Sequence, residues 1–199
     1  RSSDRRGIQS APSWPPDPWP APPARTLWNP ECRPTSDRAR EGLFSTLVSE
    51  FGSLEHLKFL DLYAGSGAVG AEALSRGVAH VDSVEHHALT AKICQENLAL
   101  IHGASGDFQV FPTTANKFLD VSADKIYDII FMDPPYDVAN QVIEEILERI
   151  GNLGLLKPDG VIVVERESRA PTFTWPAPFA ELKVRSYGQG SMFYGHIPH

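Results

Sequence analysis

The sequence has few cysteines, no long apolar run and no excess of positive charge. Its two cysteines, Cys32 and Cys94, lie too far apart for a C-x-x-C or zinc pattern and are too few for a disulfide framework. The longest apolar stretches, such as IIFM and VIVV, fall far short of the roughly 18 apolar residues that a transmembrane helix needs. We therefore expect no membrane span, no metal site and a cytoplasmic protein.

The formal net charge of −7 argues against a uniformly basic surface for nucleic acid. The charge is unevenly distributed, because residues 1–40 hold seven arginines against four acidic residues. Residues 41–199 hold eleven lysines and arginines against twenty-one acidic residues. Any phosphate-binding surface is therefore expected near the start of the folded domain. The alternative is a solvated acidic surface that carries a basic tail.

Proline divides the chain into two parts. Nine of the 17 prolines and three of the four tryptophans lie within residues 1–34. Proline has no backbone N–H, so such a stretch cannot complete the hydrogen bonds of a helix or a sheet. We expect residues 1–30 to form an extended or disordered tail and residues 31–199 to form one folded domain.

Short apolar strands alternate with helical patterns after this tail. Capping residues at 35–37 precede a first helix, and strands are predicted at 57–63, 80–85, 107–111, 127–133 and 161–165. Helices are predicted at 68–76, 88–101 and 139–150, and the KPDG sequence at 157–160 is predicted to form a turn. The alternation predicts an α/β fold with a parallel, doubly wound sheet. Residues 181–187 and 191–197 predict an antiparallel C-terminal hairpin at one edge.

A glycine loop, GSGAVG at 65–70, follows the first predicted strand. It matches the G-x-G-x-x-G pattern of dinucleotide-binding domains, and Glu85 follows Gly65 at the spacing where those domains place an acid for the ribose. Asp61, directly before the loop, would repel a pyrophosphate, but it can accept hydrogen bonds from the ammonium group of S-adenosylmethionine (SAM). We therefore favour SAM over NAD. The predicted cofactor-binding residues here are Asp61, Tyr63, Ala64, Gly65, Ser66, Gly67 and Glu85.

A second motif, DPPY at 133–136, ends the apolar strand YDIIFM. Ligands of open α/β sheets bind outside the carboxyl ends of the strands, so we expect both motifs in one cleft. The lone pair of an exocyclic base amine is delocalised, and acceptors on its N–H groups direct that lone pair toward a methyl donor. Asp133 and the Pro134 carbonyl can be these acceptors, Pro135 stiffens the turn, and Tyr136 can stack on the base. Alone, the motif could be only a rigid turn.

These residues together resemble the RsmD-like methyltransferases, which methylate N2 of a guanine in 16S ribosomal RNA. The resemblance runs from about Arg33 to about Gly195. It depends on the following segments: RPTSDRAREGLF at 33–44, DLYAGSGAVGAEALSRG at 61–77, VE at 84–85, DPPY at 133–136 and VVER at 163–166. The first is the most specific of these, since the other motifs also occur in DNA adenine methyltransferases and other amino-methyltransferases.

The resemblance implies a seven-stranded, Rossmann-like class I SAM-dependent methyltransferase sheet. It also implies that Arg33, Arg38 and Arg40 contact RNA or the cofactor region, although pairing with acids such as Glu41 is the alternative. Thr114 and Ala115 would line the adenine pocket. The family has a short basic strand pair before its R-P-T segment, whereas this chain has the proline-rich stretch there.

The expected function is that of a monomeric SAM-dependent rRNA (guanine-N2) methyltransferase acting on 16S rRNA or a partly assembled small subunit. Three alternatives stay open at this point. One is a DNA or other RNA amino-methyltransferase of the N6-adenine type, because DPPY indicates the amine and not the polymer. The others are an NAD(P)-binding Rossmann protein and a non-catalytic RNA-binding scaffold.

Overall fold

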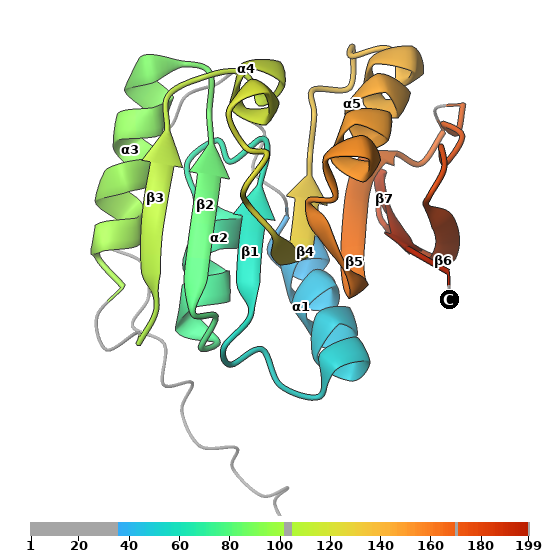
Figure 1. The fold of residues 1–199 in the computed structure, drawn as a ribbon. Coiled ribbons are helices and arrows are strands. Elements are labelled where there is room, and N and C mark those ends of the chain that lie inside the picture. The colour runs from blue at the N-terminus through green and yellow to red at the C-terminus, as the bar shows by residue number, and fades with distance from the viewer. Residues whose placement is uncertain (1–35, 102–104, 170, 199) are drawn as a thin grey trace, which may run out of the picture.

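The computed structural model describes residues 36–101, 105–169 and 171–198. The predicted tail at 1–30 and Arg33 lie outside the described residues. Seven strands form one sheet in the order β3-β2-β1-β4-β5-β7-β6 (Figure 1). The strands are β1 Lys58–Asp61, β2 His80–Val84, β3 Asp107–Phe111, β4 Tyr127–Met132, β5 Leu156–Glu167, β6 Ala180–Tyr187 and β7 Gly190–His196. The predicted α/β fold is confirmed.

Strands β3, β2, β1, β4 and β5 are parallel to one another, whereas β7 is antiparallel to both β5 and β6. The predicted hairpin is therefore confirmed, and β6 is the edge strand. The strand order reverses between β1 and β4. Strands β2 and β3 lie on one side of β1, and the later strands lie on the other side. Ligands of open α/β sheets bind at this kind of reversal.

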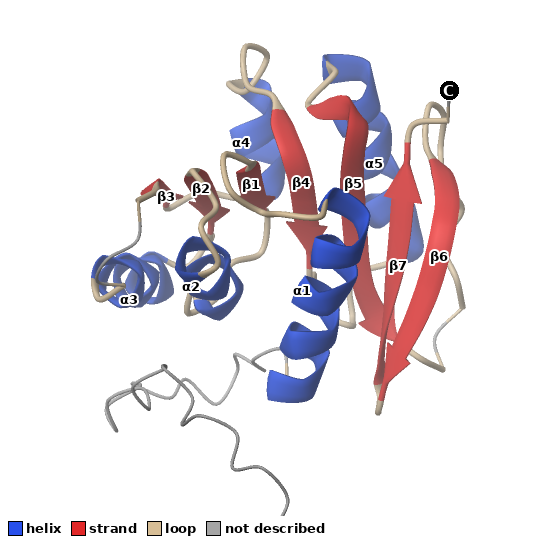
Figure 2. Ribbon diagram, turned by 90° about the horizontal axis from the view of Figure 1, so that it is seen from below, coloured by secondary structure: helices blue, strands red, loops and turns tan. Residues whose placement is uncertain are grey.

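Within the described residues, five helices cover the two faces of the sheet. They are α1 Asp37–Phe51, α2 Ala68–Ser75, α3 Ala88–Ala99, α4 Ala115–Asp120 and α5 Asn140–Leu153. Figure 2 shows α1, α2 and α3 on one face and α4 and α5 on the other. Along the buried strand β4, Ile129 and Phe131 pack on the first face, and Ile130 and Met132 pack on the second. This alternation explains why the strand is apolar throughout.

Two sequence predictions need correction. KPDG does not form a turn before β5 but lies inside it, since Leu156 already pairs with Tyr127 and a register shift follows before Ile129. A Cβ at Gly160 would lie 2.9 Å from the Asp128 backbone oxygen. Glycine is therefore needed at this position, where the two strands approach closely beside the register shift. Helix α4 was missed, because six residues are too few to show a helical period.

The predicted start of α1 agrees with the structure. Ser36 is the N-cap, and its hydroxyl accepts a hydrogen bond from Ala39 N at 3.2 Å. The buried side of the helix consists of Ala39, Leu43, Phe44 and Leu47. None of the described helices is long and apolar enough to cross a membrane.

Candidate active site

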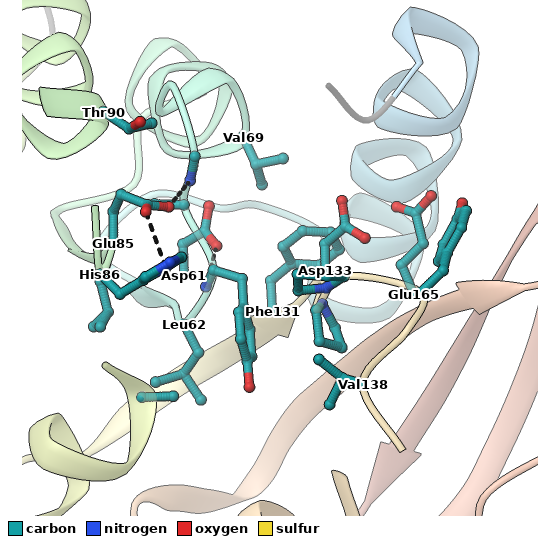
Figure 3. A pocket seen from close by; sticks show the side chains of 18 of the residues that line it. Asp61, Leu62, Val69, Glu85, His86, Thr90, Phe131, Asp133, Val138 and Glu165 are labelled. Atoms are coloured by element: carbon teal, nitrogen blue, oxygen red, sulfur yellow. Dashed lines mark hydrogen bonds and ion pairs between the residues drawn. The ribbon is translucent and has the colours of Figure 1, made fainter. Parts of the chain in front are cut away.

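A cavity of about 960 Å³ lies at the carboxyl ends of the parallel strands. The strands β1, β2, β4 and β5 each bring an acidic residue there: Asp61, Glu85, Asp133 and Glu165, respectively (Figure 3). Strand β1 pairs with β4, and β4 pairs with β5, so the glycine loop and the DPPY motif lie in one cavity. Of the predicted cofactor and catalytic residues, all but Gly67 line it.

Glu85 joins the two loops on the cofactor side of the cavity. Its Oε2 accepts a hydrogen bond from Gly65 N at 3.1 Å, and its Oε1 accepts one from His87 N at 2.8 Å. The side chain is buried. His86 Nδ1 also lies 3.2 Å from Oε1. A carboxylate has about four acceptor positions, so these contacts leave Glu85 able to accept from a ribose hydroxyl.

Gly67, a predicted cofactor-binding residue, is not among the residues that line the cavity. Its backbone N–H donates to the Ala64 carbonyl at 2.8 Å, inside the turn, and its φ of 84° is left-handed. A Cβ at this position would lie 2.7 Å from Cys94 Sγ on α3. Glycine is therefore needed here for the backbone conformation and for helix packing.

Asp61 is buried beside two other acidic residues. Its Oδ1 accepts a hydrogen bond from Tyr63 N at 3.3 Å. Burial, with smaller contributions from the charges of Asp133 and Glu85, raises the pKa of Asp61 to about 8, although the bond from Tyr63 N opposes the shift. This carboxyl group is therefore poised to exchange a proton near neutral pH when a cation binds beside it.

Thr114 and Ala115 line the cavity at the start of α4. The Thr114 hydroxyl caps this helix by accepting from Lys117 N at 3.3 Å. Thr113 and Asn116 line the same wall. Sequence analysis placed Thr114 and Ala115 at the cavity only through the family resemblance, and it did not predict that they begin a helix.

The DPPY turn directly follows β4 and is held by a residue from β5. Arg166 is buried, and its guanidinium donates to the Pro135 carbonyl at 3.3 Å and to the Val138 carbonyl at 2.7 Å. Val138 N also donates to the Pro135 carbonyl at 3.0 Å. The planar guanidinium thus ties the turn to β5, a role that sequence analysis did not assign to Arg166.

Sequence analysis also missed Glu165, His86, His87 and Thr90, which all line the cavity. A usable signal existed for Glu165, because it follows the apolar run VIVV as Asp61 and Asp133 follow the apolar residues of β1 and β4. The cavity holds a fifth acid, Asp137, and no lysine or arginine is among the described residues that line it. Its electrostatic character is therefore acidic.

Of the predicted RNA-binding arginines, Arg38 and Arg40 are described, and neither lines this cavity. Arg38 is exposed at the start of α1. Arg40 pairs with Asp37 at 2.7 Å and lies 3.9 Å from Glu72, rather than pairing with Glu41. From this segment, Ser36 lines the cavity. The described residues contain no group of three or more histidines, cysteines or acids arranged to hold a metal ion.

Comparison with known proteins gives consistent relatives. The family model described as "Conserved hypothetical protein 95" matches residues 24–195. The Haemophilus influenzae "Ribosomal RNA small subunit methyltransferase D" is 33% identical over 159 residues, which is 78% of each chain. The Bacillus subtilis "Putative rRNA methyltransferase YlbH" is 33% identical over 137 residues, covering 68% of this chain and 71% of that protein.

Solved structures agree. "Putative methyltransferase yhhF from Escherichia coli" superposes with a TM-score of 0.68 at 31% identity, covering 83% of this chain and 88% of that chain. A "putative RNA methyltransferase PH1948 from Pyrococcus horikoshii" has a TM-score of 0.63 at 19% identity, covering 81% and 85%. The second likeness is one of fold.

Proposed function

The chain belongs to the RsmD-like methyltransferase family, described as conserved hypothetical protein 95, and from this membership we propose that it methylates the exocyclic N2 amine of a guanine in 16S ribosomal RNA, with SAM as methyl donor. The curated relatives are methyltransferases by name, and the sheet, with its antiparallel β7 and β6, is that of the class I methyltransferases. The protein is accordingly an enzyme, a methyltransferase.

One observation supports the cofactor and the chemistry together: an acidic cavity joins the glycine loop to DPPY. SAM carries a sulfonium and an ammonium group, and it has no phosphate. Five acidic residues without a lining lysine or arginine among the described residues favour such a cation and oppose the pyrophosphate of NAD. Asp61 would accept from the ammonium group, and Glu85 would accept from the ribose hydroxyls.

SAM supplies a methyl group on a cationic sulfur, and the transfer breaks the S–C bond and forms an N–C bond, leaving S-adenosylhomocysteine (SAH), N2-methylguanine and one proton. The protein's part is to orient the amine. Asp133 and the Pro134 carbonyl accept from the amine, Tyr136 stacks on the base, and Arg166 keeps the turn in place. The released proton is assigned to Asp133, which lies beside the amine.

The RNA substrate is proposed from the names of the relatives and from the segment that leads into α1. Arg38 lies two residues after Ser36, which lines the cavity, so its charge would lie where RNA enters, and Arg33 belongs to the same segment of the sequence. Arg40 belongs to the same proposed surface, but its pairing with Asp37 and Glu72 reduces its contribution. The substrate would be either free 16S rRNA or a partly assembled small subunit, bound by a monomer.

Transfer of a tritiated methyl group to 16S rRNA tests the proposal. The RNA, free and as small subunits, comes from a bacterial strain that lacks the modification, and the Asp133→Ala variant is the control. We expect incorporation by the wild type at least 100-fold above the variant, and mass mapping should find N2-methylguanine. No difference between the two would refute the proposal, and N6-methyladenine would favour the adenine-type alternative.

Calorimetry with SAH and NADH in parallel tests the cofactor separately. We expect binding of SAH and none of NADH, because the acidic cavity opposes a pyrophosphate. Preferential binding of NADH would overturn the assignment of SAM. Binding of SAH without methyl transfer to any RNA would point to the non-catalytic scaffold.

A further inference from the structure

Glu165 is a buried carboxylate of the cavity that the proposed chemistry does not use. It is 6% exposed and lines the cavity from β5. Met132 pairs with Val164 in the parallel register, so Asp133 and Glu165 are the next residues on two adjacent strands. Figure 3 shows both side chains pointing into the same end of the cavity. Two acids therefore face one position, where the methyl acceptor would bind.

Gly190 on β7 provides the space for this carboxylate. A Cβ at this position would lie 2.8 Å from Glu165 Oε1 and 3.6 Å from the Tyr136 hydroxyl. Gly190 does not have a positive φ, so its backbone conformation does not by itself require glycine. Because glycine has no side chain, this position leaves room for the Glu165 carboxylate and the Tyr136 hydroxyl at the acceptor end of the cavity.

The pattern of donors on guanine matches a second carboxylate. Guanine presents two adjacent donors, N1–H and the N2 amine, and two carboxylate oxygens can accept from both. Adenine and cytosine instead place a ring nitrogen with a lone pair beside their amine. That lone pair would face a carboxylate oxygen, acceptor against acceptor, which costs binding free energy in a buried site.

We propose that Glu165 selects guanine by accepting N1–H and one N2 hydrogen, while Asp133 and the Pro134 carbonyl face the other N2 hydrogen. This inference extends the proposed function, from which it takes the guanine. It makes Glu165 a specificity-determining residue. The choice between guanine and adenine is then made on β5, because the acceptors of DPPY can accept from the amine of either base.

RNA with 2-aminopurine in place of the mapped guanine tests this role. The analogue keeps the amine at C2, but its N1 carries no hydrogen and is an acceptor. We expect the wild-type kcat/KM to fall at least about 100-fold on the analogue. Glu165→Gln presents an amide N–H that can donate to N1, so we expect its loss on the analogue to be under about 10-fold. The analogue also lacks O6, and this loss affects the wild type and Glu165→Gln alike. The difference between the two proteins in their loss of kcat/KM therefore reports on Glu165.

Glu167→Gln is the matched control, since Glu167 is exposed on the same strand and its substitution removes the same charge. It should discriminate against 2-aminopurine as the wild type does. Gly190→Ala is a second variant, and we expect it to lower kcat/KM on guanine at least 10-fold with SAH affinity unchanged, because the new methyl group displaces the Glu165 carboxylate. Calorimetry with SAH establishes that each variant is folded.

The outcomes separate this inference from the proposed function. Equal wild-type rates on guanine and 2-aminopurine, or the same discrimination by Glu165→Gln as by the wild type, would overturn the role of Glu165 and leave the guanine methyltransferase intact. A wild type that binds SAH but methylates no guanine would overturn the proposed function itself.

Discussion

Gly65 donates its backbone N–H to Glu85 Oε2 at 3.1 Å, so the acid that follows β2 also holds the loop that follows β1. The same carboxylate accepts from His87 N at 2.8 Å. Two segments of the sequence that look like separate parts of a cofactor motif are therefore one hydrogen-bonded unit.

Glu85→Gln should weaken this unit. A glutamine has one oxygen for the two backbone donors, and its amide hydrogens would face the second donor. We expect the free energy of unfolding to fall by about 1–3 kcal/mol and the dissociation constant for SAH to rise at least 10-fold. Urea unfolding and calorimetry measure the two effects. Glu96→Gln, at an exposed position of α3, is the control and should change neither.

Asp61 makes stability depend on pH in a defined direction. Its pKa is raised from 3.8 to about 8 in the folded protein, mainly by burial, so between these values the folded state binds the additional proton. Stability is therefore lost as pH rises from about 4 to about 8. We expect Asp61→Asn to lack this loss and to gain at least about 1 kcal/mol relative to the wild type between pH 5 and pH 8. Urea unfolding measures the free energy of unfolding of both proteins at each pH. The same change with pH in both proteins would contradict this prediction.

Ligand binding provides a second measurement on the same carboxyl group. If Asp61 accepts from the ammonium group of SAH, binding requires its ionised form and releases a proton below about pH 8. The wild-type affinity for SAH should then rise by up to about tenfold per pH unit between pH 6 and pH 8. Calorimetry in buffers of different ionisation enthalpy counts the proton, and Asp61→Asn should release none.

Most of the fold could be predicted because its strands are apolar and end at glycines or acids, as at Asp61 and Asp133. The same rule would have found Glu165, which follows the apolar run VIVV, although β5 continues to Glu167. What could not be predicted depends on contacts between distant segments. KPDG has the composition of a turn, and only its pairing with β4 shows that it lies within a strand. Arg166 reaches a turn 31 positions earlier in the sequence, through contacts that no local pattern encodes.

Arg166→Lys should uncouple catalysis from cofactor binding. The lysine keeps the charge, but one ammonium group cannot reproduce the planar guanidinium that donates to the Pro135 and Val138 carbonyls. We expect kcat to fall about 10- to 100-fold, because the DPPY turn loses its position, while SAH affinity changes less than about threefold. Arg169→Lys, at an exposed position after β5, should behave as the wild type. An unchanged kcat for Arg166→Lys would mean that the turn is rigid without this contact.

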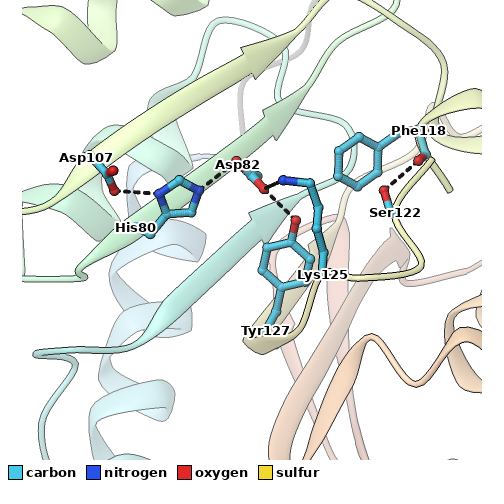
Figure 4. A network of polar contacts seen from close by, with 7 residues as sticks. All are labelled: His80, Asp82, Asp107, Phe118, Ser122, Lys125 and Tyr127. Atoms are coloured by element: carbon cyan, nitrogen blue, oxygen red, sulfur yellow. Dashed lines mark hydrogen bonds and ion pairs between the residues drawn. The ribbon is translucent and has the colours of Figure 1, made fainter.

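A buried polar network at the other end of the strands gives the last prediction (Figure 4). Asp82 accepts from Tyr127 Oη at 2.5 Å and Lys125 Nζ at 2.8 Å, and it lies 2.8 Å from His80 Nε2. Burial alone would raise the pKa of Asp82, but hydrogen bonds from these three residues outweigh it and lower that pKa. An acid with a lowered pKa stabilises the folded state above its unfolded value near 4, and this contribution is lost as pH falls through the folded value.

Asp82→Asn should therefore reduce the free energy of unfolding by about 3 kcal/mol at pH 7, since it leaves Lys125 without its buried counter-charge. The difference from the wild type should shrink below about pH 4, where Asp82 itself takes up a proton. Asp107→Asn is the matched control, because this side chain is 79% exposed and contacts the other ring nitrogen of His80, so it should cost less than about 1 kcal/mol. Urea unfolding at pH 7, 5 and 3 measures all three proteins. A cost for Asp82→Asn that is as large at pH 3 as at pH 7 would assign the effect to packing rather than to charge.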